Sequence, residues 1–83
     1  MTRKIYEIAT EISKDWENKY FGAVPYINAM KELESINDEY GADSASGVLA
    51  YFLANAQTWR GETARKVKKE INEMLKAFYA ERR

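Results

Sequence analysis

The stretch SASGVLAYFLANAQ, residues 44–57, places apolar or small side chains almost all the way round a helix. Val48, Leu49 and Phe52 share one face, whereas Gly47, Ala50 and Ala54 line much of the opposite side. A helix that is apolar on every side is normally buried on several sides. The sequence therefore predicts that this helix is the central one, with Asp43 or Ser44 as its N-cap residue.

Three further segments show the apolar spacing of amphipathic helices. The boundary between the first two segments is marked by Gly22, which favours a turn, and Pro25, which favours a helix start. Gly41 marks the boundary between the second segment and the central helix. Loops this short favour antiparallel neighbours. We expect an all-α fold, a compact array of four short helices at about 3–19, 25–40, 44–57 and 61–80, with helix three central.

Length and composition indicate one globular domain spanning residues 1–83. The apolar share of 46% is enough for a packed core, and 83 residues is a single-domain length. The longest apolar run, Val48 to Ala54, is seven residues, whereas a membrane-spanning helix needs about 20. No secretion signal is visible at the N-terminus, and the chain has no cysteine. We expect a cytoplasmic protein that does not enter a membrane.

The residue types present do not favour catalysis. The chain lacks histidine and cysteine, the usual general base and the usual thiol nucleophile, and its four glycines are isolated from one another. Glu34, Asp38, Glu39 and Asp43 lie close together in sequence, so a hard cation is conceivable there, but a solvated acidic surface is the simpler interpretation. We expect no enzyme activity, no cofactor and no metal site.

Two turns rich in aromatic residues are candidate recognition sites for another protein. Tyr20, Phe21 and Tyr26 surround a Gly/Pro turn, and Trp59 with Arg60 forms a second turn before the last helix. Tryptophan, tyrosine and arginine are the residue types most enriched at binding hot spots. The alternative is that these aromatic side chains complete the hydrophobic core, and for both turns this alternative is favoured.

The last helix also offers a basic stripe. Residues 1–59 hold five basic and nine acidic residues, whereas residues 60–83 hold eight basic and four acidic ones. Arg65, Lys66, Lys69 and Lys76 are candidates for binding the phosphates of a nucleic acid. Because glutamates interrupt the stripe, an ordinary solvated helix face is the favoured interpretation.

The small residues Gly47, Ala50 and Ala54 allow another helix to approach closely. We expect that helix to belong to the same chain. The alternative is a second copy, which would give a symmetric homodimer across this helix.

The segments YFGAVPY (20–26), TWRGETA (58–64) and IYEIA (5–9) resemble small uncharacterised helical proteins of phages and mobile elements from Gram-positive bacteria. The resemblance implies an accessory protein that binds a host or phage protein, and it assigns no residue a role. Our leading hypothesis is a non-enzymatic helical protein-interaction module. The alternative is a nucleic-acid-binding accessory protein that uses the last helix.

Overall fold

The first helix places its aliphatic residues at helical spacing on one buried side. The computed structural model describes residues 3–41 and 43–81. Helix α1 (Ile5–Asp15) buries Ile5, Ile8, Ala9 and Ile12 on one side. The helix ends four residues before the predicted boundary at 19, and the amide of Trp16 donates to the carbonyl of Ile12 at 2.9 Å.

The second helix is much shorter than the sequence predicts. After the 3-10 turn η1 (Phe21–Ala23), helix α2 runs only over Val24–Met30, with Pro25 in its first turn. The prediction of a helix over 25–40 is therefore wrong beyond Met30. The chain instead tightens into turns, in which Leu33 donates its amide to the carbonyl of Met30 and remains buried.

Side chains that compete for backbone hydrogen bonds explain why the helix stops. The carboxylate of Asp38 accepts from the amides of Glu34 and Ser35, both at 3.0 Å, and the hydroxyl of Ser35 accepts from the amide of Asn37. Such local bonds offer the backbone an alternative to a helix. The result is an irregular segment, which we call the 31–38 loop.

The 31–38 loop also completes the start of α1. The amides of Ile5 and Tyr6, which have no partner inside their own helix, donate to the carbonyls of Glu34 and Leu33 at 2.9 Å each. The loop is therefore held in place by backbone hydrogen bonds as well as by burial of Leu33.

A small hairpin, absent from the sequence prediction, precedes the third helix. Strands β1 (Glu39–Tyr40) and β2 (Asp43–Ser44) pair antiparallel, with Glu39 opposite Ser44 and Tyr40 opposite Asp43. Gly41 follows the first strand with a φ of 59°, so its positive φ serves a hairpin turn rather than the end of a helix. Ser44 then caps the next helix, because its hydroxyl accepts from the amide of Gly47.

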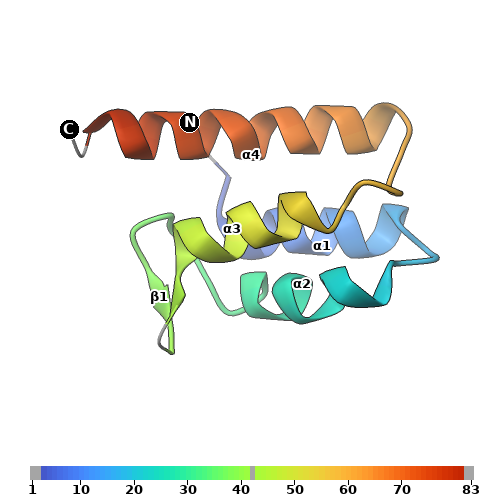
Figure 1. The fold of residues 1–83 in the computed structure, drawn as a ribbon, viewed down its shortest axis with the longest axis horizontal. Helices are drawn as coiled ribbons and strands as arrows, with labels where there is room; N and C mark the ends of the chain where they lie inside the picture. The colour runs from blue at the N-terminus through green and yellow to red at the C-terminus, as the bar shows by residue number, and fades with distance from the viewer. Residues whose placement is uncertain (1–2, 42, 82–83) are drawn as a thin grey trace.

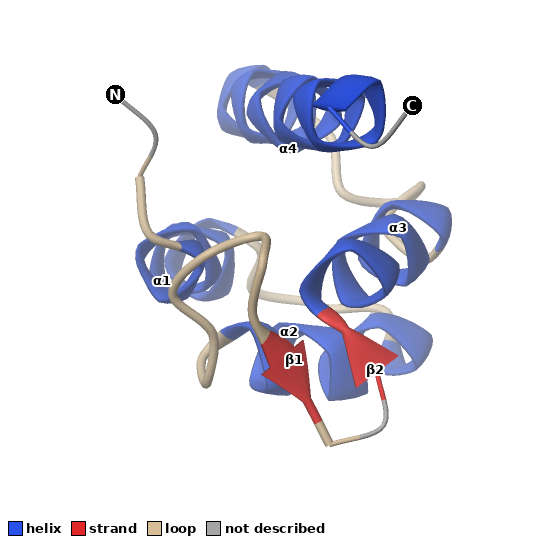
Figure 2. Cartoon of the chain, turned by 90° about the vertical axis from the view of Figure 1, so that its left-hand side faces the viewer, coloured by secondary structure: helices blue, strands red, loops and turns tan. Residues whose placement is uncertain are grey.

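Helices α3 (Ala45–Ala54) and α4 (Glu62–Glu81) complete the four predicted helices. Helix α3 packs against α2 and α4, and α1 packs against the same two helices. Figure 2 shows the four helices arranged around a common interior, with α4 on one side of the molecule. Helix α3 is nevertheless not covered on every side, because Ala50, Tyr51 and Ala54 are exposed.

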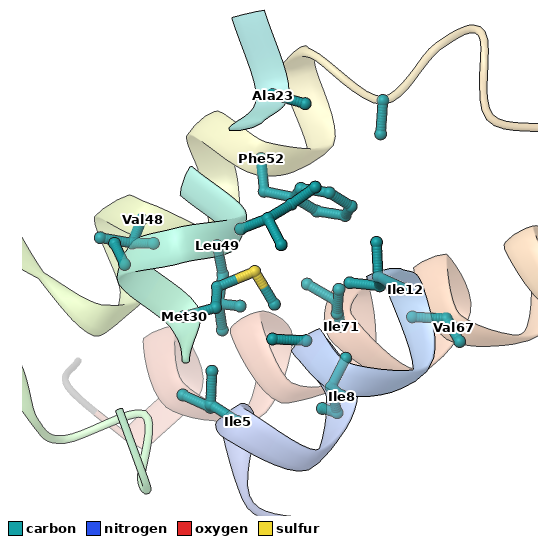
Figure 3. Packing of buried hydrophobic residues seen from close by; sticks show 14 of the residues in the cluster. Ile5, Ile8, Ile12, Ala23, Met30, Val48, Leu49, Phe52, Val67 and Ile71 are labelled. Atoms are coloured by element: carbon teal, nitrogen blue, oxygen red, sulfur yellow. The ribbon is translucent and has the colours of Figure 1, made fainter. Parts of the chain in front are cut away.

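One hydrophobic cluster holds these elements together. Figure 3 shows side chains from all four helices converging, with Met30 near the middle of the cluster. Figure 1 shows α4, the longest helix, lying along the other three. Within residues 3–41 and 43–81, no helix is both long enough and apolar enough to cross a membrane. The largest completely buried side chains are those of Phe52, Ile5, Ile8, Ile12, Ile27, Met30, Leu33, Leu49, Ile71, Val48 and Val67.

Replacing Asp38 with Asn should lower the melting temperature at pH 7. Hydrogen bonds from the amides of Ser35 and Glu34 lower the pKa of Asp38 below its ordinary value of 3.8. A lowered pKa stabilises the fold only while the carboxylate is ionised, so this contribution is present above about pH 4 and is lost as the pH falls through the folded-state pKa. Thermal melts of both proteins at pH 7 and about pH 2 would test this. A difference in melting temperature that does not shrink at low pH would contradict the assignment.

Candidate interaction surface

Trp59 belongs to the core. Its side chain is only 2% exposed, and its ring stacks on Trp16 with centroids 5.7 Å apart and meets the edge of Phe52 at 6.3 Å. The indole Nε1 donates to Oδ2 of Asp15 at 2.8 Å, while Nζ of Lys68 donates to the Trp59 carbonyl at 2.6 Å. The side chain predicted as a recognition residue therefore joins the ends of α1 and α3 to the start of α4.

Arg60 does not belong to the core as Trp59 does, because it is exposed in the turn before α4. Its positive charge acts on Lys68, whose pKa is lowered first by burial and then by repulsion from Arg60. No hydrogen bond, ion pair or ring contact among the described residues links Arg60 to the tyrosines of the other turn. Trp59 therefore belongs to the core, and Arg60 makes no such contact with Tyr20, Phe21 or Tyr26.

Tyr20 and Phe21 are exposed together. Phe21 is 80% exposed and Tyr20 is 44% exposed, and their ring centroids lie 4.9 Å apart. A Cβ atom on Gly22 would lie 2.6 Å from Cε2 of Tyr20 and 3.0 Å from Oδ1 of Asn55. Any larger residue at position 22 would therefore require the side chains of Tyr20 and Asn55 to shift, and Asn55 lies at the end of α3.

A second aromatic pair continues the same surface. The rings of Tyr26 on α2 and Tyr51 on α3 stack with centroids 5.5 Å apart, and Tyr51 is 55% exposed. Ala50 and Ala54 flank Tyr51 on α3 and are exposed as well. We call the surface formed by Tyr20, Phe21, Tyr26, Ala50, Tyr51 and Ala54 the aromatic face.

The aromatic face comes from the two longest stretches of the chain without charge. Residues 20–30 and residues 44–59 contain no Asp, Glu, Lys or Arg, although charged residues make up 31% of the chain. These stretches supply α2 and α3, which pack side by side. Depletion of charge together with enrichment of aromatic side chains is typical of the centre of a protein–protein interface.

The small-residue stripe of α3 is not covered by another helix of this chain. Gly47 is half-buried beside the hydroxyl of Ser44, but Ala50 and Ala54 are exposed. The expectation of intramolecular packing is therefore wrong for the two alanines. Sequence reasoning missed Tyr51 because it expected α3 to be buried on several sides; the available signal was that Tyr51 lies outside the face shared by Val48, Leu49 and Phe52.

The remaining predicted residues lie elsewhere. Arg65, Lys66, Lys69 and Lys76 are all exposed along α4. Glu34 pairs with Lys4 at 3.2 Å, and Asp38 accepts backbone amides, so the acidic residues do not converge. Over the described ranges 3–41 and 43–81, no group of three or more acidic side chains is arranged to hold a metal ion.

Comparison of the chain with protein-family models, with curated proteins and with solved structures finds no match.

Replacing Trp59 with Phe should lower the free energy of unfolding by about 1–3 kcal/mol, because the substitution removes the indole donor to Asp15 and leaves space beside Trp16. Urea denaturation followed by circular dichroism would measure the change. Arg60→Gln is the control in the same exposed turn and should stay within about 0.5 kcal/mol of the parent. Equal effects of the two substitutions would contradict a core role for Trp59.

Proposed function

We propose that this chain is a non-enzymatic protein-interaction module that binds a protein partner through the aromatic face. The observation that carries the proposal is the 80% exposure of Phe21 beside Tyr20, in a stretch of sequence without charge. Exposed apolar surface of this kind is stabilised when a partner covers it.

The energetics favour an interface centred on the aromatic rings. Covering a Phe side chain completely contributes about 1.5–3 kcal/mol, and Phe21 is far from covered in the isolated chain. Tyr26 and Tyr51 are already stacked on each other, so a partner would fix few additional rotamers when it binds them. Because the surface carries no charge, its binding should depend little on salt.

Binding rather than catalysis is supported by the composition, since the chain contains neither histidine nor cysteine. We propose that the interaction takes place in the cytoplasm of a Gram-positive bacterium and that the partner is a host or phage protein. The support for this setting is the resemblance carried by residues 5–9, 20–26 and 58–64.

Replacing Tyr51 with Glu should weaken partner binding by roughly 30-fold or more, the loss expected at an interface hot spot. Tyr79→Glu is the matched control, because Tyr79 is 52% exposed, close to the 55% of Tyr51, but lies on α4. Both substitutions add one negative charge. The immobilised parent and the two variants would be incubated with nuclease-treated Gram-positive lysate, and retained proteins quantified by mass spectrometry.

A protein retained by the parent and by Tyr79→Glu but lost with Tyr51→Glu would identify the partner and place it on the aromatic face. Thermal melts of both variants should show that the fold is intact. If Tyr51→Glu retains the same proteins as the parent, the aromatic face is not the binding surface.

A further inference from the structure

Helix α4 presents a line of cations to solvent on the side opposite the core. Its buried residues are Ala64, Val67, Ile71 and Leu75, while Arg65, Lys69 and Lys76 lie on the other side with Asn72 between them. Figure 2 shows that no other element covers this outer side of α4. We call Arg65, Lys69 and Lys76 the basic stripe; Lys66 is exposed at its flank.

The N-terminal segment engages one of the acidic residues of α4. Glu70 lies one turn after Lys66, where it could pair with that lysine. It is instead held by Arg3, whose Nη2 lies 2.7 Å from Oε1 of Glu70 and whose Nε donates to Oε2 at 3.1 Å. Arg3 also reaches Glu11 at 2.7 Å, so one guanidinium neutralises two carboxylates.

The cations of the basic stripe are left without acidic partners. Among the described residues, every ion pair involves Arg3 or Lys4, and none involves Arg65, Lys66, Lys69 or Lys76. A shallow depression on this side of α4 is lined by Arg65, Lys68, Lys69, Asn72, Glu73 and Lys76. Glu73 is its one acidic residue; it lies one turn after Lys69 and one turn before Lys76, but no ion pair among the described residues joins it to either lysine.

The dimensions of the stripe suit a nucleic-acid backbone. At a rise of 1.5 Å per residue, the distance from Arg65 to Lys76 along the helix axis is about 16 Å. A duplex carries one phosphate per about 3.4 Å of axis on each strand, so this length spans about five phosphates of one strand. Protein interfaces, by contrast, are depleted of lysine, and the stripe has no apolar residue that a protein partner would cover.

We propose that the basic stripe of α4 binds the phosphate backbone of a nucleic acid without reading its sequence. Electrostatic attraction between the unpaired cations and the phosphates carries the interaction. Asn72 is the single uncharged polar side chain within the stripe, which is too few for recognition of base edges. This surface is separate from the aromatic face, so either proposal can fail while the other stands.

Fluorescence anisotropy with a labelled 20-base-pair DNA duplex tests the proposal. Three phosphate contacts predict that the logarithm of the association constant falls with the logarithm of the salt concentration with a slope of about −3. The expected dissociation constant is micromolar or weaker. Lys69→Gln combined with Lys76→Gln should weaken binding at least about tenfold in low salt and reduce the magnitude of the slope by about 2.

Lys14→Gln combined with Lys31→Gln is the matched control. Both lysines are exposed; Lys14 lies on α1 and Lys31 directly follows α2. The two substitutions remove the same total charge as Lys69→Gln with Lys76→Gln. The control should bind the duplex as the parent does, and thermal melts should show both double variants folded. Equal weakening by the two pairs, affinity that does not respond to salt, or no binding in low salt would each overturn the proposal. Unlabelled duplex and polyglutamate would also be added as competitors of the labelled duplex at the same charge concentration. Equal displacement by the two competitors would overturn the assignment to nucleic acid.

Discussion

The stacked rings of Trp16 and Trp59, with Phe52 against their edges, determine which side of α3 faces inward. Trp59 is tied at both ends, through its indole to Asp15 and through its carbonyl to Lys68, so α1, α3 and α4 meet at this cluster. Once Phe52 is fixed against the edges of the two tryptophans, a rotation of about 100° per residue turns Tyr51 and Ala54 away from it. The exposed aromatic face is thus a geometric consequence of the buried tryptophan cluster.

The distribution of charge divides the surface into regions with different physical behaviour. Both charge-free stretches of the chain lie in η1, α2 and α3, whereas α1 and α4 carry their charged residues on their outer sides. Binding on the aromatic face would be driven by burial of apolar surface, which salt weakens little. Binding on the basic stripe would be driven by release of counterions, which salt opposes strongly. Salt concentration therefore separates the two proposed interactions in one protein sample.

Periodicity predicted the existence of all four helices, but it could not place the end of α2. Leu33 and Ile36 continue the helical spacing of Ile27 and Met30, so the pattern alone extends the helix to residue 40. What ends it is a set of hydrogen bonds made by Ser35 and Asp38, together with two amides of α1 that need acceptors. Such partners come from the tertiary arrangement, which a pattern along the sequence does not contain.

The sequence predicted only part of the candidate surface, because burial also depends on the tertiary arrangement. Tyr20, Phe21 and Tyr26 surround a Gly/Pro turn, where aromatic residues exceed what a loop requires, and the structure leaves Tyr20 and Phe21 exposed. Trp59 satisfies the same compositional rule but is buried, because Asp15 supplies its indole with an acceptor 44 residues away. An apolar helix such as α3 fits either a central position or an exposed interface, and only its neighbours distinguish the two.

A formal net charge of zero argues against an electrostatic partner only if the charges are mixed evenly over the surface. Hydrogen bonding to Glu70, followed by Glu11, raises the pKa of Arg3 above its already high value, so this cation holds both carboxylates at every physiological pH. A phosphate beside α4 is screened from charges more than about 8–10 Å away, and the hairpin with Glu39 and Asp43 lies on the side of the molecule away from α4 (Figure 1). A phosphate bound there would therefore respond mainly to the charges of α4, where Arg65, Lys69 and Lys76 outnumber Glu73 along the depression, although the chain as a whole is neutral.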